Sequence, residues 1–211
     1  MSLLEIDLIK NALSDDMPGP ILQSSNLSGD TRRAAVATIL RRRDEETEAL
    51  FIQRSIKESD PWSGQMAFPG GHLEATDESL RHAAERETFE EIGLDLSKYA
   101  SYVGPINEVR ANPRGRNLDM IVSPFVYILQ DEEIDLNLNY EVADVLWGSL
   151  NGMYHGLSNT ELEFNLQGQN QRFPGYSVGD QVVWGLTRSM LHHLFTMINP
   201  EWAPHDDVSH G

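Results

Sequence analysis

The stretch GGHLEATDESLRHAAERETFEEIGL, from Gly70 to Leu94, decides how the rest of the chain is interpreted. It begins with a Gly-Gly corner, continues through a polar turn, and then predicts a helix that ends at Gly93. On a helix of 3.6 residues per turn, Glu87, Glu90 and Glu91 fall within an arc of roughly 100°. Carboxylates therefore crowd one face of the predicted helix.

This crowding disfavours an isolated helix. Like charges three or four positions apart cost roughly 0.2–0.5 kcal/mol per pair, and carboxylates in a last turn oppose the helix macrodipole. A bound divalent cation reverses both effects, because hard ions such as Mg²⁺ take oxygen ligands from a few carboxylates, with water and phosphate oxygens completing the shell. A solvated acidic face is the alternative explanation.

The spacing of the fixed residues in this stretch resembles the signature of a known family. Six residues separate Gly71 from Glu78, seven more follow, and Arg86 to Leu94 then reads RETFEEIGL. This pattern resembles the Nudix box of the Nudix hydrolases, in which a Gly, a Glu and the run Arg-Glu-apolar-any-Glu-Glu-any-Gly-apolar follow in the same order. The family has five residues after the glycine, and one residue added to a loop costs little.

The resemblance covers roughly residues 34 to 198 and implies a fold and an activity. The implied fold class is α/β, a Nudix-type α/β/α sandwich with a mixed β-sheet and the box at its edge. The implied activity is Mg²⁺-dependent or Mn²⁺-dependent hydrolysis of the diphosphate linkage in a nucleoside diphosphate derivative.

The resemblance also implies roles for single residues of the box. Glu87, Glu90 and Glu91, helped by the carbonyl group of Gly71, are expected to bind the metal, and Glu87 and Glu91 are expected to be essential for catalysis. The general base that takes a proton from the attacking water stays open between a box glutamate and a carboxylate from a later loop.

Further charged residues are expected to support the loop or to serve as additional ligands. Glu78 and Arg86 are carried over from the family as a structural ion pair that orients the loop and the helix. Glu161, Glu163 and Glu141, all outside the box, are weaker candidates for an additional metal ligand or for the base.

The segment that precedes the box resembles one branch of the family, the coenzyme A pyrophosphatases. The matching residues are Arg54, Ser55, Gly64, Phe68, Pro69, Gly70 and Gly71. Ser59 stands where that branch carries a second Arg, and the path to Gly64 is one residue longer. The branch implies coenzyme A or an acyl derivative as substrate, with ADP-ribose or another nucleotide sugar as the alternative.

Several residues are candidates for binding the substrate's phosphates. Arg54 has the planar fork that suits a phosphate, although an ion pair with one of the many carboxylates is equally compatible with it. Gly70 lets the backbone come close to metal and phosphate. Arg114 and Arg116 belong to a basic loop that starts at Arg110, and they are expected to face the phosphates; a solvated loop is the alternative.

Length and charge limit the possible architectures and partners. The 211 residues show no repeats and fit a segment 1–30 with a helix and a connector, a Nudix hydrolase domain at 31–200 and a polar tail at 201–211. Thirty-three acidic residues against sixteen basic ones give a net charge of -17. Attraction to nucleic acid or to an anionic membrane is therefore unfavourable, and the expected partner is a small molecule linked to a nucleoside diphosphate.

The absence of cysteine excludes disulfides, thiolate chemistry and Cys-ligated zinc. The N-terminal stretch lacks the basic leader of a secretory signal, and no apolar run approaches the ~20 residues that cross a bilayer. We therefore expect a cytoplasmic protein. The oligomeric state stays open.

Periodicity and turn residues predict the remaining elements. The expected elements are a helix within 2–13, a hairpin of Ala34–Arg42 and Ala49–Ser55, strands at Tyr102–Val109, Met120–Leu129 and Val142–Trp147, and a closing helix at Val182–Ile198. Tyr176, Phe173 and Trp184 are candidates for stacking on a base, with a place in the core as the more common role of such residues.

A function of another class is also compatible with the pattern. A fold does not guarantee its chemistry, so the domain could bind a nucleotide without cleaving it and act as a sensor. The intact set of box glutamates argues for the enzyme, because a pure binding module has no need for a poised metal cluster.

Overall fold

The main sheet is built around a hairpin of two long strands, β1 (Arg32–Arg43) and β2 (Glu46–Arg54). Asp44 and Glu45 join them with φ values of 48° and 67°, the left-handed geometry of a two-residue hairpin turn. The predicted hairpin is therefore confirmed. The structure is a computed structural model, and it describes residues 4–13, 31–57, 62–111, 119–131, 133–166 and 169–205.

The main sheet is mixed, as expected. Its strand order is β3-β2-β1-β7-β5, with β4 paired to β1, β6 to β7 and β8 to β2. β1 and β7 run parallel, whereas β2 and β4 are antiparallel to β1. The bounds of the further strands are β3 (Met66–Ala67), β4 (Gly70–His72), β5 (Ala100–Pro105), β6 (Val109–Ala111), β7 (Met120–Leu129) and β8 (Val142–Ser149).

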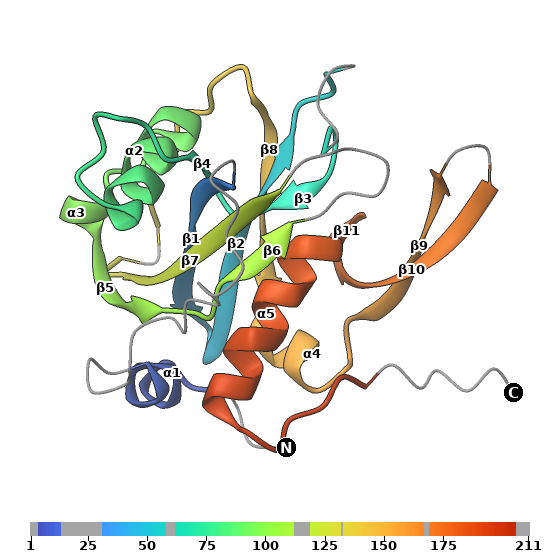
Figure 1. Ribbon diagram of the computed structural model, residues 1–211. Helices are drawn as coiled ribbons and strands as arrows, with labels where there is room; N and C mark the ends of the chain where they lie inside the picture. The colour runs from blue at the N-terminus through green and yellow to red at the C-terminus, as the bar shows by residue number, and fades with distance from the viewer. Residues whose placement is uncertain are drawn as a thin grey trace, which may run out of the picture.

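The apolar side chains of the strands form two core layers, one on each face of the sheet, because successive side chains of a strand point to opposite faces. Ile39 and its neighbours on one face pack with Ala83 and Ala84 of α2 (Leu80–Ile92). Leu40 and its neighbours on the other face pack with Leu191 and residues nearby on α5 (Gly185–Ile198). The sheet lies between these helices (Figure 1). The α/β/α sandwich is therefore confirmed.

Shorter helices complete the layers. They are α1 (Ile6–Ala12), α3 (Leu96–Tyr99) and α4 (Leu150–Tyr154). Ile9 of α1 and Leu13 after it are buried in the same core layer as α5, so the N-terminal helix packs on the body of the domain. Within the ranges that the structure describes, there is no helix with the length and apolar character of a membrane span.

A second, three-stranded sheet was not predicted. β9 (Asn159–Leu166), β10 (Gln169–Val178) and β11 (Gln181–Trp184) form it in the order β11-β10-β9. Figure 1 shows the β9–β10 hairpin extending away from the main sheet. The predicted closing helix begins too early, because Val182 to Trp184 pair with β10 and the helix starts only at Gly185.

The predicted strand Tyr102–Val109 is also partly wrong. The structure divides it into β5, which ends at Pro105, and β6, which starts at Val109. Both pair with β7, and a register shift between Tyr102 and Gly104 already disturbs the first of them. The strands at Met120–Leu129 and at Val142–Trp147 are confirmed, the second one extending to Ser149.

Candidate active site

A cavity of about 330 Å³ brings the box helix together with distant parts of the chain. Gly70, Gly71, Glu87 and Glu91 of the box line it, and Arg54 at the end of β2 lines it as well. β7 and α5 contribute apolar side chains to the same space. Most of the predicted site residues that the structure describes therefore meet at one place.

The helix that carries the box glutamates is well defined at both ends. Ser79 caps it, since its hydroxyl accepts the N–H of His82 at 3.1 Å. Gly93, with a φ of 70°, ends it in the left-handed region, and its N–H donates to the carbonyl of Phe89 at 2.9 Å. The predicted helix and its stop are confirmed, and these ends fix which side chains face the cavity.

Glu91 is the most buried of the box carboxylates, with 3% of the residue exposed. Its Oε2 accepts the backbone N–H of Gly70 at 2.9 Å. Burial raises the pKa of Glu91 to about 8, although the Gly70 N–H and the charge of Arg54 act in the opposite direction. Glu91 therefore favours its neutral form at neutral pH unless a further positive charge arrives.

The glycine corner is shaped by close contact. Gly70 has a φ of 150°, and a Cβ there would overlap the carbonyl oxygen of Ala35 and the backbone of Val36. A Cβ at Gly71 would overlap the carboxylate of Glu87. The two glycines thus allow the backbone of β4 to approach the glutamates of α2.

Glu87 and Glu90 occupy different positions relative to the cavity. Glu87 is half-buried and lines it; burial is the largest cause of its raised pKa, and the charge of Glu90 adds to the shift. Glu90 is half-exposed and is not among the residues that line the cavity. Both are held by Arg86, whose Nη1 lies 3.0 Å from Glu87 Oε1 and 3.3 Å from Glu90 Oε2.

The predicted ion pair between Glu78 and Arg86 is wrong in its acidic partner. Asp77, whose side chain is 0% exposed, receives Arg86 Nε and Nη2 at 2.9 Å each. These bonds hold the pKa of Asp77 at about 2. Glu78 is exposed, and its backbone N–H donates to His82. The six-residue spacer explains the exchange, because the family's five residues after Gly71 lead to Asp77.

The donor set of the cavity fits a hard divalent ion by its chemistry. Among the described residues, Glu74, Glu87, Glu91 and Glu141 line it. The charge of Glu74 contributes to the raised pKa of Glu87, and the charge of Glu141 contributes to the raised pKa of Glu91. Mg²⁺ and Mn²⁺ bind carboxylate oxygens, and they bind best where nearby cations do not already neutralise the carboxylates.

The described side chains do not form a closed coordination shell. No group of three His, Asp or Glu among them is arranged so that it could hold an ion as it stands. Arg86 holds Glu87 and Glu90, and the Gly70 N–H holds Glu91. A cation bound here competes with Arg86 for Glu87.

The other predicted phosphate contacts have different outcomes. Arg54 lies in the cavity wall and lowers the pKa of Glu91. Arg114 and Arg116 lie outside the described residues. Arg110 is exposed and donates to both oxygens of Asp119, at 2.7 and 2.9 Å.

The candidates outside the box separate into two groups. Glu141 lines the cavity, where Lys57 Nζ lies 2.6 Å from its Oε1. Glu161 and Glu163 do not line it and instead pair with Arg172 on the β9–β10 hairpin, at 3.6 and 3.0 Å.

An apolar wall of the cavity was missed by sequence reasoning. It includes Met66, Met120, Val122, Leu186 and Met190. These residues come from β3, β7 and α5, which are far apart in the chain, so no local pattern could indicate that they meet. His72 and Gln65, which also line the cavity, were missed for the same reason.

Comparisons with known proteins agree with the fold and the box. A family model described as NUDIX domain matches residues 31–164. An uncharacterized protein of Schizosaccharomyces pombe is 31% identical over 74% of this chain and 58% of its own length, so the chain spans little more than half of that relative. An uncharacterized Nudix hydrolase NudL of Yersinia pestis is 27% identical over 90% of this chain and 92% of its own.

A solved structure, a MutT/nudix family protein from Enterococcus faecalis, shares the fold with a TM-score of 0.56 at 15% identity. The alignment covers 82% of this chain and 64% of that one. The family resemblance predicted from the box is confirmed by the family model. None of these three names specifies a substrate.

Proposed function

The chain belongs to the NUDIX domain family, and from that premise we propose that it is a metal-dependent hydrolase that cuts the diphosphate of coenzyme A or an acyl-coenzyme A. Its match to Nudix hydrolases supports an enzyme. The observation that carries the choice of substrate is that four carboxylates and three methionines, with further apolar side chains, line the same cavity.

The acidic wall suits the diphosphate. A bound Mg²⁺ or Mn²⁺ supplies the positive charge that neutralises a diphosphate and acidifies a water molecule. Glu87 and Glu91, which line the cavity, would hold this ion, with the carbonyl group of Gly71 and with Glu90 from the same helix as further donors. The Gly70 N–H fixes the orientation of the Glu91 carboxylate, and Arg54 lies where its guanidinium fork can bind a phosphate oxygen.

The box loop keeps this wall in place. Asp77 accepts two hydrogen bonds from Arg86, and Arg86 in turn orients Glu87. The proton of the attacking water passes to a carboxylate of the cavity, and Glu74 lines it in addition to the proposed metal ligands.

The apolar wall suits the pantetheine arm of coenzyme A. Met66, Met120 and Met190 are unbranched and adaptable, so they can accommodate a flexible chain and a thioester. The cavity of about 330 Å³ lies at the lower end of the usual range for small-molecule sites. A nucleotide sugar such as ADP-ribose places hydroxyl groups on both sides of the diphosphate, and these require hydrogen-bond partners that the methionine side chains offer poorly.

ADP-ribose is the second candidate, because Gln65, His72 and Glu141 also line the cavity and can bind hydroxyl groups. A sensor that binds a nucleotide without turnover is the third. The burial of Glu91, which costs stability in a protein without metal, favours the enzyme over the sensor.

Incubation with coenzyme A, acetyl-coenzyme A and ADP-ribose in ¹⁸O-labelled water with Mg²⁺, followed by mass detection of the products, tests the proposal. We expect a phosphopantetheine and an adenosine bisphosphate, with one ¹⁸O in one of them. Cleavage of ADP-ribose alone contradicts the substrate and favours the second candidate. Tight binding without products contradicts the enzyme and favours the sensor.

A further inference from the structure

An exposed aromatic side chain directly precedes Glu141, which lines the cavity. Tyr140 is 80% exposed, yet the backbone on both sides of it is fixed. The Asn139 N–H donates to the carbonyl of Glu91 at 2.9 Å, and the Ser55 N–H donates to the carbonyl of Glu141 at 2.8 Å. The segment therefore ties the C-terminal part of α2 to the end of β2, and it holds Tyr140 on a rigid support.

A lysine links this ring to the cavity. Lys57 Nζ lies 4.7 Å from the centre of the Tyr140 ring and 2.6 Å from Glu141 Oε1. Glu141 in turn lines the cavity with the box glutamates. A ring, a cation and a carboxylate are thus assembled beside the proposed diphosphate site, and most of the ring surface is open to a ligand.

Tyr140 contributes little to the stability of the fold, because a side chain that stays in water gains almost nothing from burial. The aromatic residues that the sequence offered as stacking candidates have other contacts. Tyr176 is buried in the core, and Phe173 and Trp184 pack against each other with ring centres 5.2 Å apart. Tyr140 is the one of these four rings that is exposed and directly adjoins a residue of the cavity wall, Glu141.

We propose that Tyr140 is a specificity-determining residue that stacks on the nucleobase of the substrate, while Glu141 accepts hydrogen bonds from the ribose hydroxyl groups. This inference rests on the proposed function, because it extends a diphosphate bound at Glu87 and Glu91 outward to its nucleoside. A carboxylate accepts but does not donate hydrogen bonds, which suits hydroxyl donors. Every base has a π-face, so a single ring can supply a sequence-tolerant stacking platform.

Calorimetric titration of the full chain with AMP tests the inference, with ribose 5-phosphate as the matched ligand that lacks the base. Tyr140→Ala and Tyr140→Leu are expected to raise the Kd of AMP by roughly 5- to 100-fold, the range for loss of one base–aromatic stack. The Kd of ribose 5-phosphate should not change. Tyr140→Phe should bind AMP like the wild type, because it keeps the ring.

The chain offers a matched control on another element. Lys98 Nζ lies 4.7 Å from the centre of the Tyr99 ring, the same distance as between Lys57 and Tyr140, but Tyr99 belongs to α3, and neither of its neighbours in the sequence lines the cavity. Tyr99→Ala should leave the Kd of AMP unchanged. The inference is overturned if Tyr140→Ala binds AMP as tightly as the wild type, if it weakens ribose 5-phosphate equally, or if the wild type shows no AMP binding at millimolar concentration.

Kinetics supply a second readout that separates stacking from chemistry. An interaction that is equal in the ground state and the transition state changes KM and leaves kcat unchanged, so Tyr140→Ala should raise KM for the cleaved diphosphate at constant kcat. A fall in kcat at constant KM contradicts the inference. If the wild type cleaves none of the diphosphates, the proposed function fails, whereas the AMP titration still decides whether Tyr140 stacks.

Discussion

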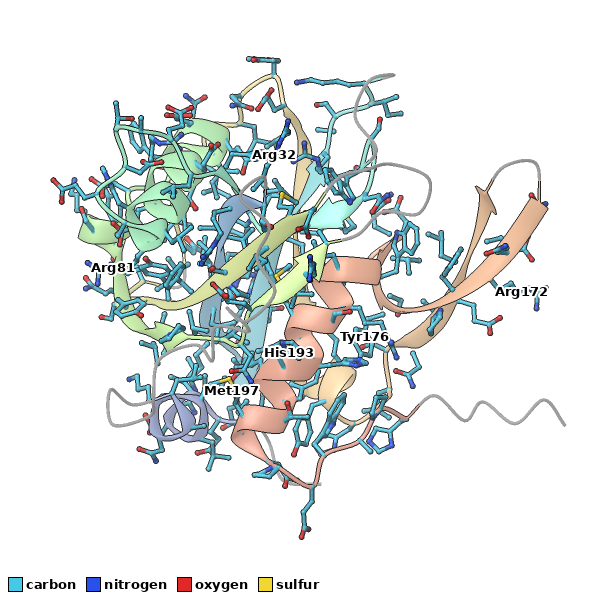
Figure 2. All side chains as sticks on the ribbon, in the orientation of Figure 1. Arg32, Arg81, Arg172, Tyr176, His193 and Met197 are labelled. Atoms are coloured by element: carbon cyan, nitrogen blue, oxygen red, sulfur yellow. The ribbon has the colours of Figure 1, made fainter. Side chains whose placement is uncertain are left out.

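Two pairs of glutamates in this protein have the same chemistry and opposite surroundings. Glu161 and Glu163 on the β9–β10 hairpin are 48% and 61% exposed at the side chain and share Arg172. Glu87 and Glu91 on α2 line a cavity, and burial raises the pKa of both. Figure 2 shows Arg172 on the outer hairpin, away from the body of the domain.

The difference shows which carboxylates need a bound cation or a proton to neutralise their charge. An exposed ion pair such as Arg172 with Glu163 contributes about 0–1 kcal/mol and is screened by salt. A buried carboxylate with an incomplete set of partners is costly and tends to take up a proton. A bound cation would therefore stabilise the carboxylates of the cavity, whereas the carboxylates of the hairpin are already stabilised by water and Arg172.

The largest expected effect is on hydrolysis. Glu87→Gln and Glu91→Gln should each lower kcat/KM under saturating Mg²⁺ by more than roughly 100-fold, because loss of a metal ligand exceeds the usual 10–100-fold cost of losing a partner of a ligand. Glu161→Gln and Glu163→Gln should retain full activity. Steady-state assays on the cleaved diphosphate, with circular dichroism to confirm the fold, compare the four variants. Full activity of both cavity variants would mean that the site is assigned to the wrong residues.

The next effect concerns the support of the box loop. Asp77→Asn should lower the free energy of unfolding by about 2–3 kcal/mol, since it removes the charge from a buried bidentate pair and leaves Arg86 without its main partner. Glu78→Gln is the matched control and should stay within about 0.5 kcal/mol of the wild type. Urea unfolding measures both. A larger decrease in the free energy of unfolding for Glu78→Gln than for Asp77→Asn would show that Glu78 is the partner of Arg86, as the family resemblance implies.

A smaller effect is expected from pH on the metal-free protein. The pKa of Glu91 is about 8 in the fold and lies near 4.3 in an unfolded chain, so between these values the folded state binds the extra proton. Its stabilising contribution is present below pH 4 and is lost as the pH rises through 8. From pH 6.5 to 8, the free energy of unfolding should fall by about 1–2 kcal/mol.

Chemical denaturation at these pH values in the presence of a chelator measures this slope. The window begins at the ordinary pKa of histidine and extends above it, so His72, whose pKa is lowered chiefly by burial, is mostly neutral in the fold throughout the window. Glu91→Gln should flatten the slope, and Mg²⁺ should raise the stability of the wild type more at pH 8 than at pH 6.5. An unchanged slope in Glu91→Gln would show that another group causes it.

The smallest effect belongs to the hairpin. Arg172→Ala should lower the free energy of unfolding by less than about 1 kcal/mol, because its partners remain hydrated. The effect should vanish in 0.5 M salt, where exposed charges are screened. Thermal unfolding at low and high salt measures it. A loss that persists at high salt would indicate that Arg172 has a packing role.

Local patterns were sufficient for much of the fold. The β1–β2 hairpin follows from two apolar runs around a charged turn, and α2 follows from the polar turn before it and from its Gly93 stop. The second sheet was missed because β9 and β10 mix polar residues with a Pro and a Gly and owe their pairing to each other. Val182 to Trp184 were assigned to a helix for the same reason, since only β10 makes them a strand.

The site was predictable where one element carries it. Glu87 and Glu91 share a helix face, so their spacing alone brings them together. Asp77 displaced Glu78 because a single added residue changes which side chain meets Arg86, and that choice depends on the path of the loop. Met120 and Met190 of the apolar wall, which come from β7 and α5, meet only after the sandwich has formed.

Titration with Mn²⁺, followed by electron paramagnetic resonance of the free ion, tests the central claim most directly. The wild type and Glu163→Gln should bind the ion with the same Kd, and Glu91→Gln should bind it at least about 10-fold more weakly. Equal binding by Glu91→Gln and the wild type would contradict the claim that the cavity carboxylates hold the metal.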